Sequence, residues 1–291
     1  MDHFPVLLDI TSFIIEPLKF DFMRKAILVS SLVAAVCGYL SSYLTLKGWA
    51  LMGDAVSHSV MPGVVVAYAL GMPISLGAFI FGVGSVTLIG FIKQKSRVKE
   101  DTVIGLVFTG FFALGIVLVS KIRSNIHLMH ILFGDPLGIS LSDIKQTILV
   151  SLLVIVLLSV FRKDLLLYCF DPRHAKTVGI NVLFLHYLLL TCLSLSAVVG
   201  LQSVGIILVV AMLITPGATA YLLTDQFDRM SIISVLSSVL SSVLGVFISD
   251  WFDLRTGGSI VLVQTFIFLF AFLFAPRYGI FKFKKMLSAQ R

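Results

Sequence analysis

The chain has 291 residues, of which 58% are hydrophobic and only 13% charged, and its mean hydropathy is +1.05. Soluble domains hold roughly 45–50% apolar and about 25% charged residues, so this composition excludes an ordinary soluble domain and predicts a polytopic membrane protein. The net charge of +7 lies mostly in short segments between apolar runs, where it orients helices in a bilayer and indicates no nucleic-acid partner.

The chain is expected to fold as an all-α protein with about nine transmembrane helices, eight to ten being the range, because one span needs about 20 mainly apolar residues. Residues 1–22 are predicted to form an N-terminal interfacial segment, residues 23–276 the transmembrane domain and residues 277–291 a basic cytoplasmic tail. The expected spans are 24–45, 50–70, 74–92, 102–120, 143–161, 182–201, 203–223, 230–249 and 257–275.

The positions of Lys and Arg predict which ends face the cytoplasm. Basic clusters occur at 93–99, 162–176 and 277–291, and an external N-terminus with nine spans puts all three in the cytoplasm. Arg24 and Lys25 would then lie outside, which is the one disagreement with this orientation.

The most informative residues, Asp54 and His58, lie four positions apart in the second expected span. Asp54 is the only carboxylate away from the ends of the expected spans, and a charge there costs about 2.5–3.5 kcal/mol on insertion scales. Positions i and i+4 share one face of a helix, and an Asp oxygen with a His nitrogen forms part of a coordination shell for a divalent transition metal. The alternative is a buried ion pair or a helix cap. His186, in an apolar span, is expected to be a hydrogen-bonded core histidine.

Two ligands are too few for Mn²⁺, Fe²⁺ or Zn²⁺, so a second chain facing the same pathway would have to supply the others, and a dimer is expected. In the outer connection, His127, His130 and Asp135 could collect metal at an entrance, although exposed loop histidines are common. On the cytoplasmic side, 163–181 is long enough for a short helix that stops at Gly179 and could contact a motor protein.

Several sequence patterns of enzymes are absent from the chain. It contains no GxxxxGK[ST], so it cannot bind ATP through a P-loop, and it contains neither HExxH nor GxSxG. The protein is therefore not expected to be an enzyme.

The segment LKGWALMGDAVSHSVMPGVVVAYALG, Leu46 to Gly71, resembles the signature of the ABC-3 family, the permeases of bacterial ATP-binding-cassette importers for manganese, iron and zinc. DTVIGLVFTGFFALGIVL from Asp101 and VGLQSVGIILVVAMLITPGATAYLL from Val199 are similar to other family segments. The resemblance implies a type II-like importer permease that works as a dimer in the bacterial inner membrane. It also implies two cytoplasmic ATP-binding subunits and an extracytoplasmic metal-binding protein as partners.

By the same resemblance, Asp54 and His58 match the family's metal pair, and Asp171, Ala175 and Gly179 match its ATPase-coupling segment. The chain would hold no cofactor of its own, would transport Mn²⁺ and/or Fe²⁺ in preference to Zn²⁺, and would leave ATP to its partner. The SVMPG after His58 is more similar to the manganese and iron branch. Two other readings stay open: a stand-alone secondary transporter or channel, which would need more intramembrane carboxylates, and a membrane scaffold in which Asp54 and His58 are a structural pair.

Overall fold

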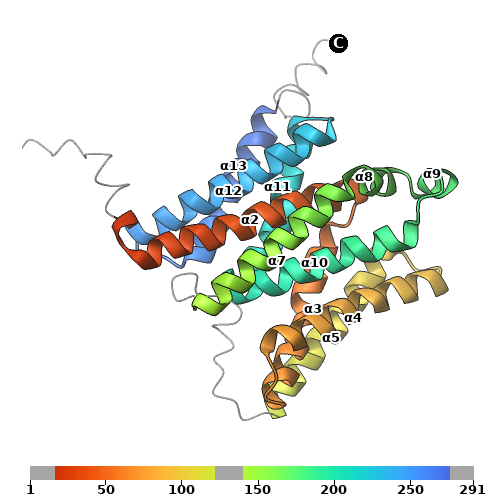
Figure 1. Ribbon diagram of the computed structural model, residues 1–291, viewed down its shortest axis with the longest axis horizontal. Helices are drawn as coiled ribbons and strands as arrows, with labels where there is room; N and C mark the ends of the chain where they lie inside the picture. The colour runs from red at the N-terminus through yellow and green to blue at the C-terminus, as the bar shows by residue number, and fades with distance from the viewer. Residues whose placement is uncertain (1–16, 122–139, 276–291) are drawn as a thin grey trace, which may run out of the picture.

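The computed structural model describes residues 17–121 and 140–275, and in these segments all regular secondary structure is helical (Figure 1). The helices are α2 (Asp21–Lys47), α3 (Ala50–Ala69), α4 (Ile74–Lys95), α5 (Glu100–Lys121), α7 (Leu141–Val160), α8 (Arg162–Phe170), α9 (Pro172–Thr177), α10 (Val182–Val204), α11 (Ile206–Leu223), α12 (Phe227–Trp251) and α13 (Thr256–Phe274).

Within these residues, eight helices are long and apolar enough to cross a membrane: α2, α4, α5, α7, α10, α11, α12 and α13. The remaining long helix, α3, has 20 residues, and its polar side chains, among them Asp54 and His58, lower its hydropathy. The protein is thus a multi-pass helical membrane protein, as predicted. Each expected span coincides with one helix, although the break expected near 202 occurs at Gly205, whose φ of 89° favours glycine.

The helices form two groups joined by α10 and α11. In one group α2 packs on α11 and α12, and α13 packs on the same two helices. In the other group α3 packs on α4 and α5 (Figure 1). Helix α10 contacts α3 and α4 as well as α2 and α7, and α11 also contacts α3, so both helices connect α3 to the rest of the bundle.

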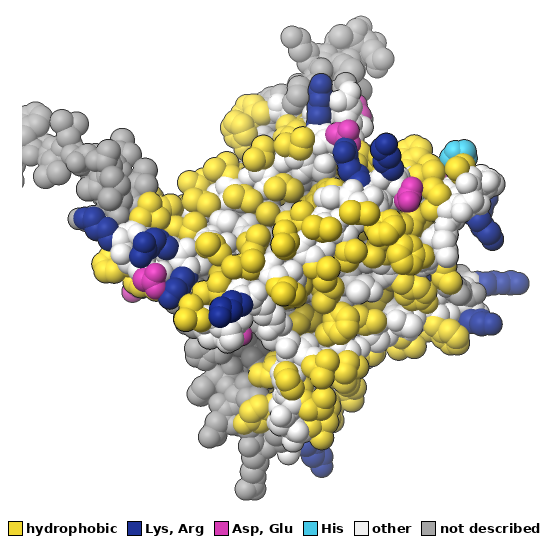
Figure 2. All heavy atoms as spheres, viewed as in Figure 1, with side chains coloured by type: hydrophobic (Ala, Val, Ile, Leu, Met, Phe, Trp, Pro, Cys, Tyr) yellow, Lys and Arg dark blue, Asp and Glu magenta, His cyan; other side chains and the backbone are white. Residues whose placement is uncertain are grey.

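Contacts between helix ends place these ends on one side of the bundle, as the predicted topology requires. Lys47, at the end of α2, donates to the carbonyl oxygen of Tyr168 in α8 at 3.3 Å, and Arg162 at the start of α8 pairs with Asp228 at the start of α12. These ends therefore lie on the side predicted to be cytoplasmic. Hydrophobic side chains cover most of the face in Figure 2, with Lys and Arg mainly around its edges.

Arg24 and Lys25 have an acidic partner on the same helix. On the first turns of α2, the Asp21 carboxylate lies 3.5 Å from a nitrogen of Arg24 and 2.5 Å from the Lys25 ammonium. The carboxylate therefore offsets part of the positive charge at the end predicted to be external.

Glycines bring the backbones of α3 and α4 into contact. A Cβ atom placed on Gly63 would lie 2.2 Å from the carbonyl oxygen of Gly77, and one placed on Gly77 would lie 2.3 Å from that of Gly63. Carbon and oxygen cannot approach so closely, so neither position accepts a side chain without separating the helices. The pair fixes α3 against α4 one to two turns beyond His58.

A buried serine of α2 satisfies backbone groups beside Pro216, which lies inside α11. Proline lacks an N–H group and interrupts the hydrogen bonds of its helix. The Gly217 N–H donates to the Ser41 hydroxyl at 2.9 Å, and the same hydroxyl donates to the carbonyl oxygen of Ile214 at 3.2 Å. A membrane interior has no water to take this role, so the serine holds α2 and α11 together.

Replacing Gly63 by alanine is expected to lower the free energy of unfolding by about 1–3 kcal/mol, because the added methyl group overpacks the contact between α3 and α4. Unfolding of the purified protein in detergent, followed by circular dichroism, measures the change. The matched control is Gly84→Ala on α4, where a Cβ atom meets nothing within 4 Å. Equal stability of the Gly63→Ala protein and the control would contradict the packing described.

Candidate metal site

Helix α3 brings Asp54 and His58 together on one face. The Nε2 atom of His58 lies 3.3 Å from an Asp54 carboxylate oxygen. The side chain of His58 is 22% exposed and that of Asp54 is 34% exposed. The i, i+4 spacing of a helix produces this contact, as predicted from the sequence. Both groups are thus only partly covered by their own chain, and a small ion could reach them.

Two phenylalanines of α5 contact the other side of the histidine. The rings of Phe108 and Phe112 meet the His58 ring edge to face, with centroids 5.2 and 5.3 Å away. The Nδ1 atom of His58 is buried and has no hydrogen-bond partner among the described residues. The ring is therefore held between two aromatic rings on one side and a carboxylate on the other.

Phe108 and Phe112 were not predicted as part of the site. Their i, i+4 spacing in an apolar helix is the only signal in the sequence, and this spacing is equally typical of ordinary packing. Only the contact between α3 and α5 shows that these two rings lie beside His58 and do not merely pack against other apolar side chains.

The other polar side chains near the pair are already hydrogen-bonded. The Ser57 hydroxyl donates to the carbonyl oxygen of Gly53 on its own helix at 2.8 Å, and the Ser59 hydroxyl donates to the Ser85 hydroxyl of α4 at 2.7 Å. These hydrogen bonds satisfy the hydroxyl protons of the two serines on a helix predicted to cross the membrane.

The described part of the chain offers no larger set of ligands. No group of three or more His, Cys, Asp or Glu side chains with the geometry for a metal ion occurs in it. His127, His130 and Asp135 lie outside the described residues.

His186 belongs to a different environment from His58. Its Nδ1 atom and the Tyr168 hydroxyl are 2.8 Å apart, and its ring meets the edge of Trp49 at 5.4 Å. The predicted hydrogen bond is confirmed, but His186 is half-buried and lines a cavity rather than lying in the core.

The predicted coupling segment consists of two short helices, α8 and α9, rather than one. Asp171 and Pro172 separate them: the Asp171 carboxylate accepts hydrogen bonds from the backbone N–H groups of Arg173 at 2.9 Å and His174 at 3.0 Å, and Pro172 occupies the first turn of α9. These bonds, that of His174 first, lower the pKa of Asp171 from its ordinary value of 3.8. Gly179 ends the segment with a φ of 89°, as its position predicted.

Ala175 and its neighbours on α9 differ in exposure. The Ala175 side chain is fully buried within its own chain, whereas Arg173, His174, Thr177 and Val178 are exposed. A contact of Ala175 with an ATPase stays a prediction. In this structure the surface of α9 that a partner can reach consists of the exposed side chains.

A bundle of long apolar helices defines the chain as a polytopic membrane protein. Comparison with known sequences identifies the group: the pattern of the ABC 3 transport family matches residues 19–275, and the chain belongs to that family.

Named relatives cover almost the whole chain. It is 54% identical over 280 residues to the manganese transport system membrane protein MntB of Synechocystis, which covers 96% of this chain and 92% of that protein. It is 49% identical over 263 residues to the chelated iron transport system membrane protein YfeD of Yersinia pestis, with coverage of 90% and 89%.

Two solved structures share the fold. A chain of PsaBC from Streptococcus pneumoniae, solved in complex with a Fab, matches with a TM-score of 0.85 and 41% identity over 94% of this chain and 99% of that one. A putative metal-chelate type ABC transporter in an inward-facing conformation matches with a TM-score of 0.62 at 18% identity, over 83% and 84% of the two chains, which shows the fold alone.

Replacing Asp171 by alanine is expected to loosen α9, because the amides of Arg173 and His174 lose their acceptor. Hydrogen–deuterium exchange of the segment at neutral pH should be several-fold faster in Asp171→Ala, whereas Asp171→Asn, which can still cap the helix, should stay close to the wild type. Because folding lowers the pKa of Asp171, the cap is fully present above the ordinary value of 3.8 and is lost as the pH falls through the lowered pKa. Unchanged exchange in the alanine variant would show that the cap does not hold α9.

Proposed function

We propose that this protein is the membrane permease subunit of an ATP-driven importer of divalent transition metal ions, with Mn²⁺ and Fe²⁺ favoured over Zn²⁺. The observation that carries the proposal is the Asp54–His58 pair inside the helical bundle. Relatives named for manganese and chelated iron transport, at 54% and 49% identity, support the choice of metals.

The geometry of the pair suits two ligands of one ion. Ligand atoms at about 2.1 Å from an ion, at octahedral or tetrahedral angles, lie roughly 3.0–3.4 Å from each other. The observed separation of 3.3 Å between the carboxylate oxygen and Nε2 falls in that range. An ion between the two atoms would keep Asp54 ionised and His58 neutral, so neither group would need to enter the membrane as an unpaired charge.

Two ligands cannot complete the shell of a transported ion, and a second permease chain is the proposed source of the others. The partial exposure of Asp54 and His58 leaves the pair accessible to such a chain. The partner can be identical to this chain or a paralogue.

The other proposed partners are two ATP-binding subunits and an extracytoplasmic metal-binding protein. The sequence has no P-loop, so ATP would be hydrolysed by two separate cytoplasmic subunits. Those subunits would dock on the segment formed by α8 and α9, and an extracytoplasmic metal-binding protein would deliver the ion to the opposite side of a bacterial inner membrane.

The substitutions Asp54→Ala and His58→Ala are expected to reduce Mn²⁺ and Fe²⁺ uptake at least about tenfold, because each removes a direct ligand. Accumulation of radioactive manganese or iron in cells that lack the chromosomal gene and carry each variant measures the effect. Ser57→Ala is the matched control, since its hydroxyl bonds only to its own helix and the residue lies between the two proposed ligands.

Two outcomes would count against the proposal. Undiminished uptake in Asp54→Ala at normal expression would favour a structural role for the pair. Uptake by membrane vesicles that contain no ATP would favour a stand-alone transporter or channel instead.

A further inference from the structure

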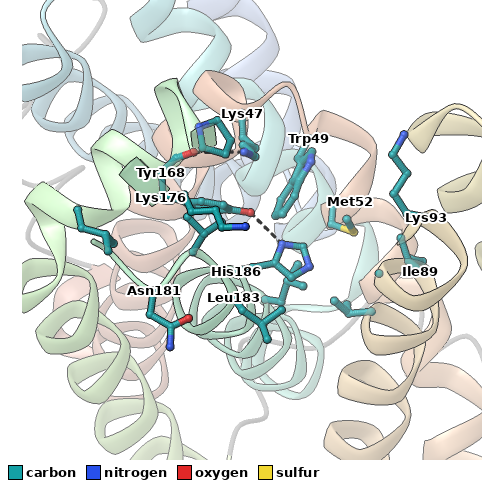
Figure 3. Close-up of a pocket in the computed structure, with 16 residues that line it drawn as sticks. Lys47, Trp49, Met52, Ile89, Lys93, Tyr168, Lys176, Asn181, Leu183 and His186 are labelled. Atoms are coloured by element: carbon teal, nitrogen blue, oxygen red, sulfur yellow. Dashed lines mark hydrogen bonds between the residues drawn. The ribbon is translucent and has the colours of Figure 1, made fainter. Parts of the chain in front are cut away.

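Four side chains at the end of the bundle predicted to be cytoplasmic contact one another in a closed sequence (Figure 3). The Lys47 ammonium donates to the carbonyl oxygen of Tyr168 at 3.3 Å and lies 4.1 Å from the centre of its ring. The Tyr168 hydroxyl and the Nδ1 atom of His186 are 2.8 Å apart, and the His186 ring meets the edge of Trp49 at 5.4 Å. Trp49 in turn lies 5.7 Å from the Lys47 ammonium. These four residues are called the Tyr168 cluster below.

The Tyr168 cluster joins four helices. Tyr168 lies on α8 and His186 on α10, whereas Lys47 is the last residue of α2 and Trp49 directly precedes α3. Helix α8 packs on α2, α7, α9 and α10. Tyr168 therefore reaches the start of α3 through two side chains, His186 and Lys47, because both of them contact Trp49.

Helix α8 has an inner and an outer face. Leu165, Tyr168 and Cys169 are buried against the bundle, whereas Phe170 at its end is 78% exposed. The outer face continues into the exposed side chains of α9, where the ATP-binding subunits are proposed to dock. A displacement of this segment by a docked subunit would therefore move the Tyr168 hydroxyl relative to His186.

The start of α3 is close to the proposed metal ligands. Only Gly48 and Trp49 separate α2 from α3, and Trp49 is 4% exposed. Asp54 follows Trp49 by five residues, which is roughly 7.5 Å along a helix axis. Because the backbone hydrogen bonds make a helix move largely as a unit, a shift of Trp49 would be passed to Asp54 and His58.

The Tyr168 cluster has space to move on one side. All four of its residues line a cavity of about 570 Å³, which also borders Gly90 of α4. A Cβ atom on Gly90 would lie 3.4 Å from the Nε2 atom of His186, so the absence of a side chain there leaves room beside the imidazole. Close-packed interiors resist displacement of side chains, whereas a ring that borders a cavity can shift without a clash.

We propose that Tyr168 and His186 are positioning residues that couple the movement of α8 and α9 during ATP hydrolysis to α3 and its Asp54–His58 pair. The proposal rests on the proposed function of the chain as an importer permease. A hydroxyl can both donate and accept, so its contact with Nδ1 forms with either neutral tautomer of the histidine. A hydrogen bond also weakens steeply when its angle changes, so this contact would form in one position of α8 and break in another.

The test uses the complete transporter with its ATP-binding subunits in liposomes and measures Mn²⁺ uptake and ATP hydrolysis in the same vesicles. Tyr168→Phe keeps the ring beside Lys47 and removes only the hydroxyl. The number of Mn²⁺ ions transported per ATP should fall roughly fivefold, which corresponds to the loss of one hydrogen bond. The Mn²⁺ affinity should stay as in the wild type, because Tyr168 is not a ligand, and the unfolding temperature confirms that the variant is folded.

Two further variants distinguish coupling from a general effect on packing. The matched control Tyr187→Phe removes a hydroxyl from the position next to His186 and should keep the wild-type ratio of Mn²⁺ to ATP, since the Tyr187 ring still meets the His186 ring. His186→Leu should lower the ratio as well. When Tyr168→Phe is added to His186→Leu it should have no further effect, because its partner is already absent.

The outcomes separate this proposal from the proposed function. A wild-type ratio in Tyr168→Phe, an equal loss in Tyr187→Phe, or losses that multiply in the double variant would each overturn the coupling role of the Tyr168 cluster. Absence of ATP-driven uptake by the wild-type complex would instead overturn the proposed function, and the coupling role with it.

Discussion

A helix that carries a carboxylate and an imidazole can cross a membrane only where its neighbours shield or use both groups, and the fold depends on that constraint at α3. An intramembrane charge costs about 2.5–3.5 kcal/mol on insertion scales. The contact of Gly63 with Gly77 holds α4 against α3, and the phenylalanines of α5 enclose the His58 ring. The nearby serines bond to backbone or to one another. Asp54 and His58, 34% and 22% exposed, are the groups proposed to bind the ion.

The end of the bundle predicted to be cytoplasmic connects that pair to the surface of the protein. Lys47 bonds to Tyr168 of α8, the Tyr168 hydroxyl contacts His186 of α10, and the His186 ring meets Trp49 immediately before α3. A displacement of α8 and α9 by a docked partner would therefore reach the start of α3 through direct contacts. This chain of contacts gives a physical route between the proposed ATPase docking segment and the proposed metal ligands.

The sequence predicts the spans well because each is a long apolar run bounded by glycine, proline or charge, and it predicts the Asp54–His58 contact because helical spacing is local. It also places Gly179 at a turn. The environment of the pair could not be predicted, since Phe108 and Phe112 meet His58 only through packing of α5 on α3, which are distant in the sequence. The break between α8 and α9 could have been predicted, because Asp171 and Pro172 are typical of the start of a helix. The burial of Ala175 could not, because no sequence pattern indicates it.

Pulsed electron paramagnetic resonance of Mn²⁺ bound to the purified transporter, unlabelled and labelled with ¹⁵N-histidine, tests the central claim most directly. Mn²⁺ held by Asp54 and His58 should show hyperfine coupling to directly bound imidazole nitrogen, and two such nitrogens per ion if an identical second chain completes the site. The coupling should disappear in His58→Ala and persist in His186→Gln, because His186 lines a separate cavity. Bound Mn²⁺ without nitrogen coupling, or with coupling unchanged in His58→Ala, would contradict the assignment of this pair as the metal site.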